Sequence, residues 1–281
     1  MSLPGTEFSV DGMVAVVTGA AQGLGVAIAE QLAAAGATVT LADLQLEKTQ
    51  LAADRLCQAG STAAAVRLDV TDSGQVDDVM AQVADAHGRL DILVNSAGLG
   101  QKVMPIVELD DDEWQRVLDV NITGTFNCCR AAARQMETQE SGAIVNFTSI
   151  NGQNPAALVG AYNVAKAGVI SLTRTLAMEL AAYKVRVNAV SPGPVYTEFN
   201  RKVMAQRCQS LNLTEEEMIE RVRQAVPLGR WGEPTDIAAT VAFLCSPAAS
   251  WITGEVLRVS GGLEGVAAAP PKRSRPSESA S

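Results

Sequence analysis

The sequence is poor in the side chains that most often carry chemistry near neutral pH. Its 281 residues include one histidine, His87, and five cysteines, none of which form a pair spaced for a metal ion. Metal catalysis and His-dependent triads are therefore not expected, and no metal site is predicted. The adjacent Cys128 and Cys129 point in different directions on an apolar helical segment, so we interpret them as small core residues rather than a redox pair.

Basic residues and long apolar runs are also scarce. Lys and Arg number 22 against 31 Asp and Glu, a formal net charge of −9, which argues against nucleic-acid partners and anionic membrane surfaces. No uninterrupted apolar run approaches the roughly 20 residues of a membrane span. The first twelve residues lack the basic and then apolar pattern of a signal peptide. We therefore predict a cytoplasmic protein without nucleic-acid or membrane partners.

What is present is a regular alternation of two kinds of segment. Short apolar or β-branched runs predict strands at Met13–Thr18, Thr38–Ala42, Ala64–Leu68, Asp91–Asn95, Ala143–Thr148, Arg186–Val190 and Val256–Val259. Longer segments with helical period lie at about 24–35, 45–59, 72–87, 112–137, 160–182 and 234–245. Strands that alternate with helices favour right-handed crossovers and a parallel sheet covered on both faces. The pattern predicts a single α/β domain over residues 1–266, with a doubly wound, seven-stranded parallel sheet.

Two segments interrupt this alternation. Residues 192–233 hold several prolines and a charged, helical stretch, and we expect them to form a lobe beyond the carboxyl ends of the strands. Insertions at that edge of an α/β sheet commonly cover ligands. Residues 267–281 are rich in Pro, Ser, Lys and Arg without periodicity, which is typical of a disordered tail.

A glycine-rich turn follows the first predicted strand and opens the first helix. The stretch Thr18-Gly-Ala-Ala-Gln-Gly-Leu-Gly25 has the spacing G-x-x-x-G-x-G. Such a turn lets the backbone approach a pyrophosphate, whose negative charge meets free amide groups and the positive end of the helix dipole. On its own the glycine triplet is weak evidence, but its position between a strand and a helix predicts a dinucleotide site.

Asp43 ends the second predicted strand, 18 residues after Gly25. A carboxylate there accepts hydrogen bonds from the adenosine ribose hydroxyls and repels a 2′-phosphate, whereas NADP favours a nearby Arg or Lys. Gln22 and Leu44 supply no such cation, so we predict NAD as the cofactor. Asp43 can instead act as the N-cap of the helix that begins near Gln45, and the two roles are compatible.

Tyr162 and Lys166 lie four residues apart on a predicted helix, so they share a face. A neighbouring cation favours the phenolate and brings the pKa of a tyrosine towards the working range for proton transfer. Taken alone, a pair at this spacing is usually a half-buried ring beside a solvated ammonium, so the rest of the chain has to decide between the two interpretations.

The turn from Thr18 to Gly25 together with the Tyr162–Lys166 pair resembles the short-chain dehydrogenase/reductase family, in its compact single-domain branch. The resemblance covers about residues 8–263. It implies a Rossmann fold and hydride transfer between a nicotinamide cofactor and a CH–OH group.

The resemblance also implies which residues bind the cofactor. Asp69 would bind the adenine amino group and the Val70 amide the adenine ring, while Val195 and Thr197 would reach the nicotinamide carboxamide. In the turn Asn95-Ser-Ala-Gly98, Ser96 replaces the second Asn of the family's N-N-A-G motif. The full set implied is Gly19, Gln22, Gly23, Leu24, Gly25, Asp43, Leu44, Asp69, Val70, Asn95, Ala97, Gly98, Tyr162, Lys166, Pro192, Gly193, Val195 and Thr197.

Four catalytic residues follow from the same resemblance. Tyr162 would exchange the proton of the substrate hydroxyl, and Lys166 would lower the Tyr162 pKa and reach the nicotinamide ribose. Ser149, thirteen residues before the tyrosine, would stabilise charge on the carbonyl oxygen. Asn121 would hold a water in a proton path from Lys166 to solvent.

The substrate is less well defined by the sequence. Residues Asn151, Gln153 and Asn154 follow Ser149 and can hydrogen-bond a polyol or sugar, or can simply be polar turn residues. Tyr196 in the lobe is a further candidate. We predict an NAD-dependent dehydrogenase or reductase acting on a secondary alcohol or ketone. A 3-oxoacyl thioester reductase and a non-catalytic NAD-binding scaffold are the alternatives.

The resemblance further implies assembly into a homotetramer or homodimer. In the family the helices that correspond to residues 112–137 and 160–182 pack across a two-fold axis. Small residues on the second helix would suit close approach at that axis: Ala165, Gly168, Ala177 and Ala181.

Overall fold

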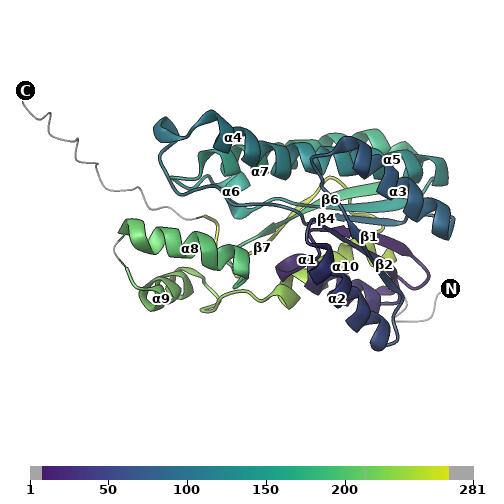
Figure 1. The fold of residues 1–281 in the computed structure, drawn as a ribbon, viewed down its shortest axis with the longest axis horizontal. Helices are drawn as coiled ribbons and strands as arrows, with labels where there is room; N and C mark the ends of the chain where they lie inside the picture. Colours follow the sequence, from purple (N-terminus) through teal and green to yellow (C-terminus); the bar gives the residue numbers. More distant parts are fainter. Residues whose placement is uncertain (1–7, 212, 266–281) are drawn as a thin grey trace, which may run out of the picture.

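A seven-stranded parallel sheet forms the centre of the structure (Figure 1). The computed structural model describes residues 8–211 and 213–265. The strands follow the order β3-β2-β1-β4-β5-β6-β7, which confirms the predicted doubly wound sheet. Their bounds are β1 (Val14–Thr18), β2 (Thr38–Asp43), β3 (Ala63–Arg67), β4 (Ile92–Asn95), β5 (Gly142–Phe147), β6 (Val185–Pro192) and β7 (Val256–Val259).

The strand order reverses beside β1, which pairs with β2 on one side and with β4 on the other. Every residue of β1 is buried, as expected for a strand covered on both faces. Thr18, its last residue, lies opposite Ala42 of β2 and Asn95 of β4. The register therefore brings the glycine-rich turn, Asp43 and the turn after Asn95 to one edge, where α/β sheets bind ligands.

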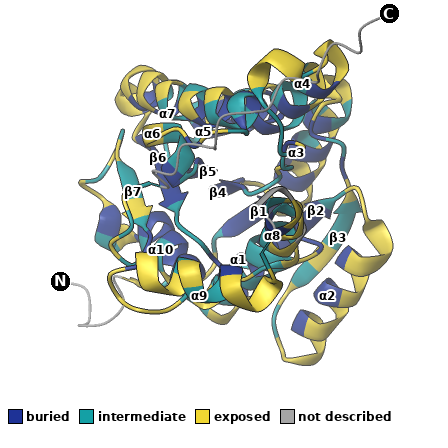
Figure 2. Ribbon diagram, turned by 90° about the vertical axis from the view of Figure 1, so that its left-hand side faces the viewer, coloured by how far each residue is buried: buried dark blue, intermediate teal, exposed yellow. Residues whose placement is uncertain are grey.

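Helices cover both faces of the sheet, and Figure 2 shows that their inward sides are the buried ones. One layer consists of α1 (Gly23–Ala34), α2 (Leu46–Gln58) and α10 (Pro234–Cys245), and the other of α3 (Ser73–His87), α5 (Gly124–Gln139) and α7 (Gly160–Leu180). Each layer has its own hydrophobic core. Cys128 and Cys129 lie fully buried in the second core, which confirms their interpretation as core residues.

The prediction of one continuous helix over residues 112–137 is wrong, because the helix is interrupted. The structure has α4 (Asp111–Leu118), then a π-helical turn (Asp119–Thr123), and only then α5. The side-chain amide of Asn121 donates to the Val117 carbonyl, four residues earlier, at 2.9 Å. The side chain thus competes for the acceptor that an α-helical amide would use, which favours the wider turn. Such turns often occur at functional sites.

The segment between β6 and α10 forms two further helices, α8 (Glu198–Leu211) and α9 (Glu215–Ala225). They enclose a small core of their own, made by Met204, Cys208 and Met218 with Trp231 against it. A capping box on Thr214 starts α9. We call residues 192–233 the lobe from here on.

The predicted tail at residues 267–281 lies outside the described residues. Among the helices that are described, none is long and apolar enough to cross a membrane.

Candidate active site

The glycine-rich turn joins β1 to α1 in a conformation that needs its glycines. Gly19 has a φ of +67°, and a Cβ there would lie 2.7 Å from the backbone of Ala97. A Cβ on Gly25 would collide with the Gly19 carbonyl. Gln22 precedes α1 without a side-chain capping bond, so the first amides of the helix remain available. The turn is therefore a cradle with free donors, which suits a pyrophosphate.

Asp43 lines the cavity beside the turn and is not the N-cap of α2, a position that Gln45 occupies. Its carboxylate accepts from the Ala21 amide at 3.1 Å and from the Gln45 amide at 2.9 Å. It therefore ties the glycine-rich turn to the start of α2. Arg67 of β3 is its register partner, but does not belong to the cavity lining. Among the described lining residues the only cation is Lys166.

The cavity above the carboxyl ends of β1 and β4 has a volume of about 410 Å³. Every predicted cofactor-binding residue lines it except Asn95. The side-chain amide of Asn95 donates to Asn146 Oδ1 at 2.9 Å and to Cys129 Sγ at 3.2 Å, within the core. Because successive side chains of a strand point to opposite faces, this last residue of β4 supports the site from below.

The turn after β3 is held in place by its own polar contacts. Asp69 Oδ1 accepts from the Thr71 amide at 3.0 Å and from the Thr71 hydroxyl at 2.7 Å. The Val70 carbonyl accepts from the side chain of Asn127 at 3.0 Å. Asp69 and Val70 both line the cavity, so this turn forms a fixed wall of it.

The four residues predicted as catalytic lie together at the same cavity, although they come from three different segments. The ammonium of Lys166 donates to the Phe147 carbonyl at 2.9 Å and lies 5.6 Å from the centroid of the Tyr162 ring. Ser149 is the N-cap of the short helix α6 (Ile150–Gln153), its hydroxyl accepting from the Asn151 amide at 3.2 Å.

Burial controls the protonation of the Tyr162–Lys166 pair. It raises the pKa of Tyr162 to about 12, and a hydrogen bond with Ser149 acts in the opposite direction. Burial also lowers the pKa of Lys166 to about 8. Loss of water around the phenol thus dominates the Tyr162 pKa in this structure, and Ser149 is the group that opposes the rise. The effect of Lys166 on the Tyr162 pKa stays a prediction.

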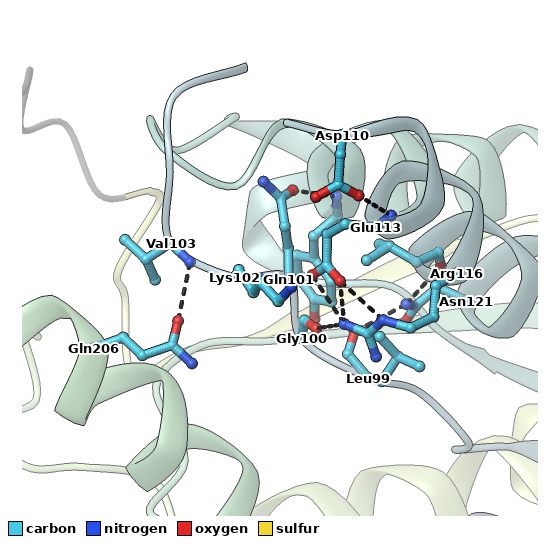
Figure 3. Close-up of polar contacts among 12 residues, drawn as sticks. Leu99, Gly100, Gln101, Lys102, Val103, Asp110, Glu113, Arg116, Asn121 and Gln206 are labelled. Carbon is cyan, nitrogen blue, oxygen red and sulfur yellow. Dashed lines mark hydrogen bonds and ion pairs between the residues drawn. The ribbon is translucent and has the colours of Figure 1, made fainter. Parts of the chain in front are cut away.

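Asn121 lies where the π-helical turn meets the loop after β4 (Figure 3). Its amide donates to the carbonyls of Leu99 and Val117, both at 2.9 Å. Its Oδ1 is buried and has no partner among the described residues. A Cβ on Gly98 would lie 3.0 Å from that oxygen and 3.6 Å from Lys166 Nζ. Asn121 therefore offers an unused acceptor close to the lysine.

The loop that continues from Leu99 leads from β4 towards α4 and makes a hydrogen bond to the lobe (Figure 3). The Lys102 amide donates to the buried carboxylate of Glu113 at 2.8 Å, and Arg116 pairs with the same carboxylate at 2.8 Å. One residue later the Val103 amide donates to Gln206 Oε1 of α8 at 3.0 Å. The lobe thus has a direct polar contact with the active-site side of the sheet.

A second cavity of about 470 Å³ lies between the lobe and α6–α7. Its lining shares with the first cavity Ser149, Tyr162, Pro192, Gly193, Phe199 and Asn200. Of the residues predicted to bind substrate, Ser149 and Asn151 line it.

The other three candidate substrate residues do not line this cavity. Gln153 is exposed, and the Asn154 side chain donates to the Glu264 carbonyl at 2.6 Å. Tyr196 packs edge-on against Trp231, with 5.7 Å between ring centroids. The short helix α6 and the start of the lobe thus direct these side chains away from the lining of the second cavity, and their contact with a substrate stays a prediction.

A family model described as enoyl-(acyl carrier protein) reductase matches residues 19–264. The match spans most of the chain and includes the glycine-rich turn and the Tyr162–Lys166 pair. The chain belongs to the short-chain dehydrogenase/reductase family. It is thus an NAD(P)-dependent oxidoreductase of that family.

Individual relatives in the short-chain dehydrogenase/reductase family differ in their named activities. The chain is 41% identical to cis-4-hydroxycyclohexanecarboxylate dehydrogenase of Sinomonas cyclohexanicum, over 90% of this chain and 97% of that protein. It is 40% identical to galactitol 2-dehydrogenase (L-tagatose-forming) of Cereibacter sphaeroides, over 92% and 97%. It is 37% identical to 3-oxoacyl-[acyl-carrier-protein] reductase of Synechocystis sp., over 89% and 96%.

A solved member of the family has the same fold. The structure of 7α-hydroxysteroid dehydrogenase, complexed with NADH and 7-oxo glycochenodeoxycholic acid, superposes with a TM-score of 0.86 and 32% identity. The comparison covers 94% of this chain and 99% of that chain.

Several residues at this short-chain dehydrogenase/reductase site were missed by sequence reasoning. They line the second cavity and are polar or charged: Gln101, Asn200, Arg207 and Arg221. Gln101 is almost fully buried, with its Oε1 accepting from the Tyr162 amide at 3.3 Å. No local motif marks these positions, because they come from three segments that are remote in the chain: Gln101 from the loop after β4, Asn200 and Arg207 from α8, and Arg221 from α9.

Proposed function

We propose that the protein is an NAD-dependent oxidoreductase that transfers hydride between nicotinamide and a secondary alcohol or ketone. A polyol or another sugar-derived compound is one such substrate. The observation that carries the proposal is that Ser149 and Tyr162 line both cavities. One cavity has the features of a dinucleotide site, so the two hydroxyls lie at the junction where a substrate would meet the cofactor.

The bound nicotinamide would supply or accept the hydride. Tyr162 would donate its proton to a carbonyl oxygen, or remove one from an alcohol. Its hydrogen bond with Ser149 favours the phenolate. With a substrate bound, the single proton of the Ser149 hydroxyl would instead be donated to the substrate oxygen that gains charge.

Lys166 and Asn121 would support this proton transfer by returning a proton to Tyr162 after each turnover. The pKa of Lys166, lowered to about 8 by burial, lies near neutral pH, where a lysine can release and regain a proton. The unpaired Oδ1 of Asn121 can accept from a water beside that ammonium. We assign these two residues to a relay that restores the Tyr162 proton from solvent.

We assign the preference for NAD over NADP to Asp43. The described wall of the cavity around it includes a second carboxylate, Asp69, and no cation near either. A 2′-phosphate placed there would meet negative charge without compensation. The glycine-rich turn and the first amides of α1 would hold the pyrophosphate, and Thr197 and Val195 the nicotinamide end.

The substrate would occupy the second cavity, covered by the lobe. A galactitol dehydrogenase and a cyclohexane-ring alcohol dehydrogenase among the relatives support a secondary alcohol. The second candidate is a 3-oxoacyl thioester, which the Synechocystis relative and the apolar lining by Ile150, Val203 and Met204 favour.

We further propose assembly into a homodimer or homotetramer through α5 and α7. Three large apolar side chains on these helices are exposed: Phe126, Val164 and Met178. Exposed apolar groups of this size commonly mark a contact between subunits. The small-residue face predicted from the sequence is wrong as a surface, because Ala165 and Ala177 are buried within the protomer.

A panel assay tests the proposal. Formation of NADH from NAD, and of NADPH from NADP, is measured with secondary alcohols, polyols and hydroxy acids, and the reverse reaction with ketones and a 3-oxoacyl thioester. We expect turnover of a secondary alcohol with NAD. NADH binding without turnover of any compound would favour a non-catalytic scaffold, and preferred use of NADP would contradict the role of Asp43.

A further inference from the structure

The second cavity has an unusual distribution of charge. Among its described lining residues only two carry a formal charge, and both are arginines: Arg207 of α8 and Arg221 of α9. The whole chain has 22 basic and 31 acidic residues, so an arbitrary surface would favour carboxylates. The rest of the lining is apolar or uncharged, with Gln101, Asn151 and Asn200 as polar groups.

The positions of the arginines on their helices explain why both reach the cavity. Arg207 follows Val203 by four residues and Met204 by three, and all three line the cavity from one face of α8. On α9, Arg221 shares a face with Met218 and Ala225 in the same way. Each guanidinium thus belongs to a helix face that is otherwise apolar.

The two arginines differ in their surroundings. Arg207 is half-buried, and burial lowers the pKa of its guanidinium. An arginine stays charged even so, and a partly dehydrated cation gains from a nearby anion. Arg221 is exposed and takes part in no hydrogen bond or ion pair within the described part of the chain. Two residues further on, Arg223 pairs with Glu220 at 2.6 Å, outside the cavity.

The arginines lie away from the reacting groups. Phe199 and Asn200, at the start of α8, line both cavities, whereas Arg207 and the residues of α9 line only the second. Arg207 follows Phe199 by eight residues, which is about 12 Å along the helix axis. Apolar residues separate the two ends: Ile150, Leu158, Val203, Met204, Met218 and Trp231.

We propose that the substrate is a hydroxy acid or oxo acid, with its carboxylate held by Arg207 and Arg221 and its reacting carbon beside Ser149 and Tyr162. The proposal rests on the proposed function and narrows its substrate class. The apolar lining between the two ends fits a ring or a short chain of carbons. A guanidinium fork matches a carboxylate in geometry and charge, which would fix the orientation of the substrate.

The test compares a matched pair of substrates, 4-hydroxycyclohexanecarboxylate and its uncharged carboxamide, with NAD. We expect kcat/KM to be at least about tenfold higher for the acid. Arg207→Gln and Arg221→Gln should each lower kcat/KM for the acid by a larger factor than for the carboxamide, so that the ratio falls. Arg223→Gln, on the same helix but outside the cavity, should keep the wild-type ratio. Equal use of both substrates by the wild type, or equal losses for both in the variants, would overturn the proposal.

A binding measurement separates this proposal from the proposed function. Calorimetric titration with cyclohexanecarboxylate and cyclohexanecarboxamide, in the presence of NADH, needs no turnover. If the wild type binds the carboxylate and Arg221→Gln binds it more weakly, the anion site is supported even if no substrate is turned over. Arg207→Lys keeps the charge and serves where Arg207→Gln does not fold. Failure of the wild type to bind the carboxylate more tightly than the carboxamide would refute the anion site.

Discussion

The two cavities share Ser149 and Tyr162 but are built in different ways. The first cavity is formed by turns at the carboxyl ends of strands, and hydrogen bonds between side chains and backbone hold the turns after β1 and β3. The second cavity is closed by the lobe, whose own core holds three buried apolar residues among those that the structure describes: Met204, Cys208 and Met218. One fold thus combines a first cavity held by hydrogen bonds at the strand ends with a second cavity whose cover has only a small hydrophobic core.

This difference has a consequence for stability and motion. Helix α9 exposes most of its residues and α8 buries only Met204 and Cys208 among those described, whereas α1 buries five and α10 six of their twelve residues (Figure 2). Segments with few buried apolar contacts open at low free-energy cost. We therefore expect amide hydrogen exchange to be faster in the lobe than in the strands, and mutations in the lobe to change substrate affinity more than folding.

The largest effect is expected where the two cavities meet. Tyr162→Phe removes the group that transfers the proton, and kcat should fall by about 10²–10⁴-fold. Affinity for NADH, measured by fluorescence titration, should stay close to that of the wild type. A variant that keeps more than about a tenth of kcat would show that Tyr162 is not the acid–base group.

The second prediction concerns how the stability of the fold depends on pH, through the buried Lys166 of the first cavity. Burial lowers the pKa of Lys166 from its ordinary value of 10.5 to about 8. Below about pH 8 the lysine is charged in the folded and in the unfolded state, and the folded state bears the full free-energy cost of burying the charge. As the pH rises, the folded state releases the proton first while the unfolded state retains it, so stability rises.

This linkage can be isolated with Lys166→Met, which cannot titrate. The free energy of unfolding of the wild type relative to this variant should increase by about 2 kcal/mol between about pH 8 and pH 9.5. Chemical denaturation at several pH values measures it. A difference that is constant over this range would mean that the lysine is not dehydrated.

The third effect concerns Asp43, at the adenosine end of the first cavity. Asp43→Asn removes the charge and keeps one acceptor for the amides of Ala21 and Gln45. The ratio of kcat/KM for NAD to that for NADP should fall on the order of tenfold. Asp69→Asn is the matched control, since it removes a second carboxylate of the same cavity and should change the ratio less. Equal changes in both variants would assign the preference to overall charge.

The smallest effect should come from the contact between the sheet and the lobe. Gln206→Ala removes the acceptor of the Val103 amide. Because this bond is exposed, unfolding stability should change by less than about 1 kcal/mol. The KM for substrate should rise about two- to threefold, with kcat and NADH affinity unchanged. Gln209→Ala, an exposed neighbour on α8, should leave the KM unaltered, and an equal rise there would remove the special role of the Gln206 contact.

Sequence reasoning succeeded where function follows from local order along the chain. The turn from Thr18 to Gly25 and the pair Tyr162–Lys166 are motifs of adjacent residues, and the structure brings them to one cavity. Reasoning failed where a side chain contributes through distant contacts. Asn95 supports the core rather than lining the cavity, and Tyr196 packs against Trp231.

The sequence by itself determined the alternation of strands and helices along the chain, the glycine-rich turn and the shared helix face of Tyr162 and Lys166, because each depends on short-range spacing and on the pattern of apolar residues. Ser149 and Asn121 were implied by the resemblance to the family. Only the tertiary structure decided three further features. These are the π-helical turn around Asn121, the burial that controls the Tyr162 and Lys166 pKa values, and the meeting of Arg207 and Arg221 at one cavity. Each of them arises from the packing of segments that are remote in the chain, and local spacing does not encode that packing.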